Sequence, residues 1–129
     1  MKLLLDTHVW LWLQACPDRI EAWTLAQLED VSNELLLSAA SSWEIAIKYA
    51  IGRLPLPVPP NDYVESRMAQ SGTSGLPVQH RHALQVATLP MHHRDPFDRL
   101  LVAQAQIEKT VLVTADRRMD PYDVERLSA

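Results

Sequence analysis

The sequence predicts an α/β fold with a mainly parallel sheet, and three of its features indicate this class. Short apolar runs alternate with segments of helical periodicity along most of the chain. The runs at 3–5 and 35–37 are consecutive leucines without polar alternation, as expected of strands covered on both faces. At 129 residues, 47% of them hydrophobic, the chain can bury a core without disulfides. Residues 1–129 are therefore expected to form a single domain.

The first half of the chain reads as strand and helix in alternation. Residues 2–6 form a short apolar run that ends in a carboxylate, which predicts a buried strand followed at once by a turn into a helix. The next segment, 18–30, has amphipathic periodicity with Asp18 as its expected N-cap. A second strand is predicted over 34–39, and a helix over 41–51, before Gly52.

The middle of the chain begins with a stiff connector. Four prolines between 55 and 60 forbid regular structure there. Two helices are predicted after it, over 61–71 and 80–89. Between them, Gly72 to Gly75 and a short apolar run at 76–78 are expected to form a connection.

The last third has the clearest helix signal of the sequence. Asp95 is a natural cap, and Pro96 suits the first helical position, so a helix is predicted over 97–108. A strand is expected over 111–114. The final residues, 123–129, are predicted to form a short strand at the edge of the sheet.

Charge and cysteine content exclude several functions. The formal charge is −4, from 12 Lys and Arg against 16 Asp and Glu, so contact with nucleic acid must be local or bridged by a metal. Cys16 is the single cysteine, which argues against disulfides and a cysteine-rich zinc site. No apolar run approaches the ~20 residues that span a bilayer, so no membrane association is expected. Asp6 and His8 interrupt the apolar start, which favours the cytoplasm over a signal sequence.

Acidic residues fall where the predicted strands meet the helices that follow. Asp6 ends the first strand, Glu44 is expected in the first turn after the second, and Asp116 follows the strand over 111–114. In a parallel sheet such junctions share one edge, and Asp98 joins them if its helix starts on that side. Carboxylates this close raise one another's pKa unless a cation neutralises them. Oxygen ligands without cysteine favour Mg²⁺ or Mn²⁺.

Each of these acids also has an ordinary structural interpretation. Glu44 fits a capping box with Ser41 and an ion pair with Lys48. Asp98 suits the positive end of a helix, and Asp116 a turn or a cap. A carboxylate directly after a buried strand is costly without a partner, so Asp6 is the hardest of them to explain structurally.

Other residues have two interpretations each. His92 and His93 are adjacent and precede a cap, so they are expected at the surface or against substrate, with metal ligation as the less favoured alternative. The tryptophans favour core or dimer contacts, with base stacking as the alternative; they are Trp10, Trp12, Trp23 and Trp43. Four arginines can bind substrate phosphate or balance neighbouring acids; they are Arg94, Arg99, Arg117 and Arg118.

Four motifs in order resemble a known family. They are LLLDTH at 3–8, SWEIAIK at 42–48, HHRDPFDRLLVAQA at 92–105 and VTAD at 113–116. Together they resemble the PIN-domain ribonucleases, and more narrowly the VapC-type toxins of bacterial type II toxin–antitoxin pairs. The resemblance implies a PIN-like three-layer α/β/α fold and Mg²⁺- or Mn²⁺-dependent endonucleolytic cleavage of RNA. It also implies a homodimer, inhibition by a cognate antitoxin, and a set of site residues: Asp6, Glu44, Asp98 and Asp116 as metal ligands, with Thr114 and Asp95 supporting them.

Two alternatives to a nuclease remain open. One is a noncatalytic PIN-like module that keeps its acids and acts by protein contact. The other is a phosphoacceptor receiver domain, which also gathers acids around Mg²⁺ but needs an acceptor Asp at the end of a middle strand. The second predicted strand ends in Ser38 and Ala39, which disfavours the receiver domain.

Overall fold

A five-stranded sheet forms the centre of the protein in the computed structural model, which describes all residues from 1 to 129. Its spatial order is β3-β2-β1-β4-β5, and every neighbouring pair is parallel. The strands are β1 (Lys2–Leu5), β2 (Glu34–Ser38), β3 (Thr73–Leu76), β4 (Val111–Thr114) and β5 (Arg126–Ser128). The predicted α/β class is confirmed, and so is the C-terminal edge strand.

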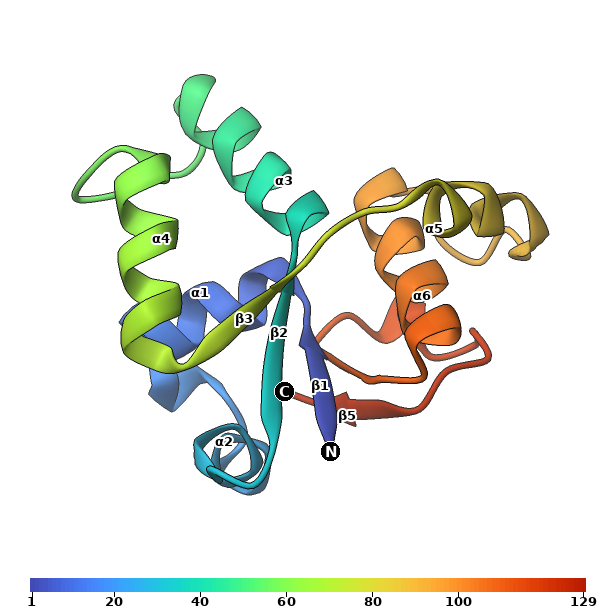
Figure 1. Cartoon of the computed structure of the whole chain (residues 1–129), viewed down its shortest axis with the longest axis horizontal. Coiled ribbons are helices and arrows are strands. Elements are labelled where there is room, and N and C mark those ends of the chain that lie inside the picture. The colour runs from blue at the N-terminus through green and yellow to red at the C-terminus, as the bar shows by residue number, and fades with distance from the viewer.

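Helices cover both faces of the sheet and complete three layers. Figure 1 shows α1, α2 and α4 on one side, α5 and α6 on the other, and α3 extending beyond the carboxyl end of β2. The six helices are α1 (Thr7–Ala15), α2 (Ala22–Glu29), α3 (Ala39–Ala50), α4 (Pro60–Ser71), α5 (His80–Gln85) and α6 (Pro96–Glu108). None of them is both long enough and apolar enough to cross a membrane.

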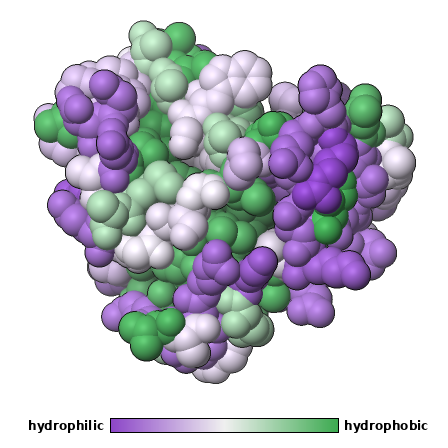
Figure 2. All heavy atoms as spheres, viewed as in Figure 1, coloured by the Kyte–Doolittle hydropathy of each residue, from purple (hydrophilic) through white to green (hydrophobic).

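Alternate leucines of the central strands build two separate cores. Leu3 and Leu5 of β1 pack with Trp10 and other residues on the α1 side, whereas Leu4 packs with Leu101 on the α6 side. Side chains of a strand point to opposite faces in turn, so a run of leucines serves both cores. In Figure 2, hydrophilic residues gather over the outer helices, and apolar residues show in the hollow between them.

The structure corrects two helix starts. The predicted N-cap role of Asp18 is wrong, because Pro17–Arg19 forms a separate 3-10 turn and α2 begins only at Ala22. Ile20 between them is extended, which interrupts the helical pattern. Helix α3 starts earlier than predicted, since the side chain of Ser38 accepts a hydrogen bond from the Ala40 amide at 3.0 Å and caps it.

The largest omission of the sequence prediction is strand β3. Residues 73–76 were expected to be a connection, but they pair in parallel with β2 along its length. The sequence Thr-Ser-Gly-Leu has no strand periodicity, so only the backbone of β2 makes it a strand. The helix predicted over 80–89 is also shorter, because α5 ends at Gln85 and a 3-10 turn, Val86–Thr88, follows.

Candidate metal centre

Five carboxylates, among them the four acids singled out in the sequence, line one cavity of about 260 Å³ at the carboxyl edge of the sheet. Asp6 directly follows β1, and Asp116 lies just beyond β4. Asp98 lies in the first turn of α6, and Glu44 projects from α3. Parallel strands bring their carboxyl ends to one edge, so residues far apart in the sequence meet there. The structure thus brings together all four acids that the sequence singled out.

The carboxylate of Asp6 is held away from the helix that it precedes. Although Asp6 is the N-cap residue of α1, its side chain makes no cap hydrogen bond. Instead Thr114, at the end of β4, donates its hydroxyl to Oδ2 of Asp6 at 2.8 Å. Burial raises the pKa of Asp6, and the Thr114 hydrogen bond opposes that shift. Thr114 therefore contacts Asp6 directly and also accepts from the Asp116 amide at 3.0 Å.

Glu44 lies further along its helix than expected. Because α3 begins at Ala39, Glu44 is on the second turn rather than the first. The predicted capping box with Ser41 is wrong, since Ser41 instead accepts a hydrogen bond from Thr7 at 2.8 Å. The ion pair with Lys48 is confirmed, with its Nζ donating to Oε2 of Glu44 at 2.6 Å. Glu44 is buried, so this cation offsets part of the cost of its charge.

His93 is the site residue that the sequence interpretation placed wrongly. It is 5% exposed rather than a surface residue, and its Nε2 lies 2.8 Å from Oδ2 of Asp98 and 3.1 Å from Oδ2 of Asp116. Its Nδ1 accepts from the Asp95 amide at 3.3 Å, which places the ring proton on Nε2. The ring therefore donates to Asp116, and the same nitrogen lies within ion-pair distance of Asp98. The local signal was the adjacent His92–His93 pair, of which only His93 turns inward.

The carboxylates of Asp98 and Asp116 have opposite pKa shifts. Burial, and then the negative charges of Asp6, Asp95, Glu44 and Asp116, raise the pKa of Asp98 to about 8. Hydrogen bonds from the exposed side chain of Arg118, at 2.8–3.2 Å, lower the pKa of Asp116 to about 2. Burial makes this concentration of negative charge costly, and a bound cation would relieve that cost.

We expect the metal-free protein to lose stability as the pH rises from 6 towards 9. The folded-state pKa of Asp98, about 8, lies above its ordinary value of 3.8, so the folded protein holds a proton that the unfolded chain releases. Its contribution is fully present below about pH 4 and is lost as the pH rises through about 8. Thermal melts in chelator at several pH values measure this slope. A melting temperature that is flat over this range, or rises, would contradict the assignment.

Arg99 does not face the cavity, so its predicted contact with substrate is wrong. It is 8% exposed, and its guanidinium donates to backbone carbonyls of Val86, Leu89, Pro90 and His93 and to the Tyr122 hydroxyl, at 3.0–3.4 Å. These bonds attach the segment before α6, residues 86–93, to α6 and to Tyr122. Arg94 and Arg117 are not buried in this way, and Arg118 balances Asp116.

Asp95 has a structural role and also borders the site. Its Oδ1 accepts from the Phe97 amide at 2.9 Å and from the Asp98 amide at 3.4 Å, which confirms the predicted cap of α6. Pro96 occupies the first turn as expected. Because Asp95 also lines the carboxylate cavity, the cap fixes where Asp98 enters it.

The tryptophans have different environments. Trp10 is fully buried, as predicted for a core residue, and donates to the Thr73 hydroxyl at 3.2 Å. Trp23 and Trp43 are more than 60% exposed. Trp12 is half-buried and lines the carboxylate cavity together with His8. His8 is a site residue that no local sequence pattern indicated; it stands one turn before Trp12 in α1.

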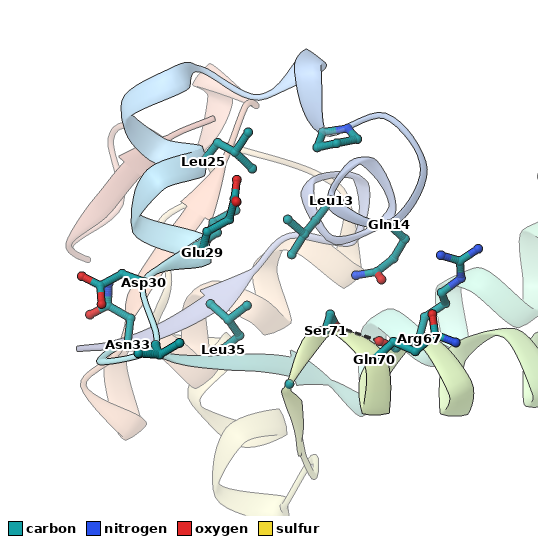
Figure 3. Close-up of a pocket in the computed structure, with 14 residues that line it drawn as sticks. Leu13, Gln14, Leu25, Glu29, Asp30, Asn33, Leu35, Arg67, Gln70 and Ser71 are labelled. Carbon is teal, nitrogen blue, oxygen red and sulfur yellow. Dashed lines mark hydrogen bonds between the residues drawn. The ribbon is translucent and has the colours of Figure 1, made fainter.

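A second cavity, larger than the carboxylate cavity, lies elsewhere. A groove of about 690 Å³ is bounded by α1, α2 and the end of α4. Figure 3 shows Leu13, Leu25 and Leu35 pointing towards its middle, with Arg67 at one rim. Leu35 stands near the start of β2, whereas the acids follow strand ends, so the groove opens near the other edge of the sheet. The two cavities share no residue.

The donor set of the carboxylate cavity fits a hard divalent cation. Five carboxylates line it, and the ion pairs with Lys48 and Arg118 neutralise only part of their charge. Oxygen ligands of this kind select Mg²⁺ or Mn²⁺, and such sites leave positions for water and phosphate. Within this cavity Asp98 and Asp116, together with His93, have potential ligand atoms within 4.8 Å of one another, whereas Asp6 and Glu44 line the cavity outside that group.

Fold and site together define the class: an all-parallel α/β protein that gathers acids at the carboxyl edge of its sheet. The model of the PIN domain family matches residues 3–125. The chain belongs to the PIN domain family.

Two relatives from Mycobacterium tuberculosis carry the name of an enzyme. Ribonuclease VapC22 is 32% identical over 117 residues, which covers 91% of this chain and 88% of that protein. Ribonuclease VapC16 is 56% identical over 59 residues, 46% of this chain. That match spans only 42% of VapC16.

Solved structures share the fold at low sequence identity. VapBC2 from Rickettsia felis, bound to a DNA fragment from its promoter, superposes with a TM-score of 0.72 at 14% identity, over 99% of this chain and 98% of that one. FitAcB from Neisseria gonorrhoeae gives a TM-score of 0.64 at 23% identity, over 98% and 96% of the two chains. The expected three-layer PIN fold is confirmed.

Proposed function

We propose that this protein is a Mg²⁺- or Mn²⁺-dependent endoribonuclease that hydrolyses RNA phosphodiester bonds. The observation that carries the proposal is the convergence of Asp6, Glu44, Asp98 and Asp116 on one cavity, with the pKa of Asp98 raised by burial and by the other acids. Family membership and the ribonuclease relatives supply the reaction class. A metal at the site also gives an acidic protein of net charge −4 a local attraction for phosphate.

The residues of the cavity have distinct roles in this proposal. When bound, the metal lowers the pKa of a coordinated water and polarises the scissile phosphate. Asp6, Asp98, Asp116 and Glu44 would hold the ion, and one of these carboxylates would accept the proton of the attacking water. Thr114 fixes the orientation of Asp6, and Asp95 fixes the start of α6 and hence Asp98. Arg94 and Arg117, which follow His93 and Asp116 in the chain, bind phosphates of the substrate.

His93 acts as a positioning residue in this scheme. Its Nε2 binds Asp116 and lies 2.8 Å from Asp98, which keeps the two carboxylates on one side of the cavity. The two carboxylates are thus oriented before a metal enters, which lowers the cost of assembling the site.

We also propose a cognate antitoxin as the partner and a homodimer as the working form. The proposal rests on relatives and structural neighbours that are named as VapC and VapBC proteins. Expression of the intact protein alone should arrest growth of a bacterial host, and expression of Asp98→Asn should not. Growth arrest that survives this substitution would favour the noncatalytic PIN-like module.

Cleavage of a mixed pool of structured RNA tests the enzyme directly. We expect internal cuts with Mg²⁺ or Mn²⁺ and none with chelator, because the carboxylates alone cannot activate water. Asp98→Asn, purified in the same way, controls for contaminating nuclease. If a folded, metal-binding sample leaves every RNA of the pool intact, the nuclease proposal fails and the noncatalytic module is favoured.

A further inference from the structure

We propose that His8, Trp12 and Arg19 form a subsite that stacks an unpaired RNA base beside the carboxylate cavity. The inference deepens the proposed function and rests on it for the position of the scissile phosphate. It requires that a nucleotide next to the cut be unpaired, so that its base is free to leave its stack.

The first argument is position. His8 and Trp12 line the same cavity as the four acids. They stand one helical turn apart on α1, which begins directly after Asp6, so both project towards the same side. Their ring centroids are 6.5 Å apart, with planes inclined at 55°. A phosphate held by the carboxylate-bound metal would therefore have an aromatic wall beside it.

The second argument is charge. The guanidinium Cζ of Arg19 lies 4.6 Å from the centroid of the Trp12 ring, in cation–π geometry. None of the ion pairs of the protein uses Arg19 or His8. The guanidinium lies over the ring, so a base stacks on the planar Trp12–Arg19 pair, and the uncompensated charge of Arg19 attracts the adjoining phosphate.

The third argument is selectivity among the tryptophans. Trp43 is exposed but packs edge-on against Phe97, and it does not line the cavity. Trp23 is 63% exposed on α2 and also stands apart from the cavity. Trp12 differs because its inner side packs against the core of the α1 face, so the ring is held in place before a base arrives. A preordered ring loses little entropy on binding.

Binding of single-stranded RNA tests the subsite without requiring turnover. The probe is a labelled RNA of about 12 nucleotides and mixed sequence, within the span that single-strand sites cover. It is titrated by fluorescence anisotropy in the Asp98→Asn background so that it is not cut. We expect Trp12→Leu to weaken binding about tenfold, since a stacked base contributes ~1–3 kcal/mol. Trp12→Phe, which keeps a ring, should stay within about threefold, and Trp23→Leu, the matched exposed control, within about twofold.

Two further measurements distinguish base stacking from nonspecific attraction between the protein and phosphate. With the same RNA annealed to its complement, Trp12→Leu and its parent should bind equally, because paired bases are not available. Arg19→Gln should lower the slope of log K against log salt by about 0.7, the value for one phosphate contact on a single strand.

Several outcomes would overturn the inference. These are unchanged single-strand affinity in Trp12→Leu, an equal loss in Trp23→Leu, or an equal loss on duplex RNA. A changed subunit number of Trp12→Leu in sedimentation would instead place Trp12 in an interface between copies. If binding depends on Trp12 but the wild type cuts no RNA, the subsite stands and the nuclease fails. If the protein cuts RNA in a metal-dependent way but Trp12→Leu does not weaken binding, the nuclease proposal stands and the subsite proposal fails.

Discussion

Asp98→Asn should abolish RNA cleavage and, in the same protein, raise the melting temperature of the metal-free form. The amide has the same shape and can still contact the His93 ring, whose Nε2 lies 2.8 Å from the carboxylate. It lacks the charge that holds a metal, so the cleavage rate should fall more than about 100-fold, beyond the loss typical of groups that only support a ligand. Gel-based cleavage rates in Mg²⁺ measure this part.

The gain in stability has an electrostatic cause. Burial and the surrounding acids raise the pKa of Asp98 to about 8, which is the cost of placing its charge there. Asparagine removes that cost, and we expect a gain on the order of 2 kcal/mol in the free energy of unfolding at pH 8. That corresponds to several degrees in melting temperature, and the pH slope of the wild type should flatten.

An exposed aspartate provides the matched control. Asp123→Asn makes the same chemical change outside the cavity, and neither cleavage nor melting temperature should move. If Asp98→Asn cuts RNA at the wild-type rate, Asp98 does not hold the catalytic metal. If it melts at the wild-type temperature at pH 8, the charge cluster does not strain the fold.

Arg99→Met should destabilise the protein by about 3–5 kcal/mol, because it leaves several buried acceptors without a donor. The guanidinium donates to four backbone carbonyls and to the Tyr122 hydroxyl. Methionine fills a similar volume but donates nothing. Urea unfolding, followed by circular dichroism, measures the loss, and Arg99→Lys should recover only part of it.

The control distinguishes an internal scaffold from a substrate contact. Arg94 and Arg118 are both exposed, but Arg118 pairs with Asp116, whereas Arg94 forms no ion pair and is therefore the better control. Arg94→Met should change the free energy of unfolding by less than about 0.5 kcal/mol. If Arg99→Met unfolds at the wild-type urea concentration yet binds RNA more weakly, Arg99 contacts substrate after all. Both Arg94 and Arg99 lie close to an acid of the site in sequence. Only the burial of Arg99 and the exposure of Arg94 distinguish a structural role from contact with substrate.

Predictions from the sequence succeeded where a local rule was sufficient. Asp95 and Pro96 mark the start of α6 because a cap and a fixed φ act within one turn. The leucines of β1 and β2 indicate a strand buried on both faces, since no polar residue interrupts them. The same rules failed at β3, whose residues have no strand pattern and are ordered only by pairing with β2.

The sequence by itself determined the parallel α/β class and the acids that could share one edge of the sheet, because strand patterns and helix caps are encoded in neighbouring residues. The tertiary structure decided which other groups face those acids. His93 reaches Asp116 across 23 residues, and Thr114 reaches Asp6 across 108. Arg99 turns inward, while His8 and Trp12 turn towards the cavity. Such contacts depend on how separate segments pack, so neither the hydrophobic periodicity of a segment nor its helix caps can specify them.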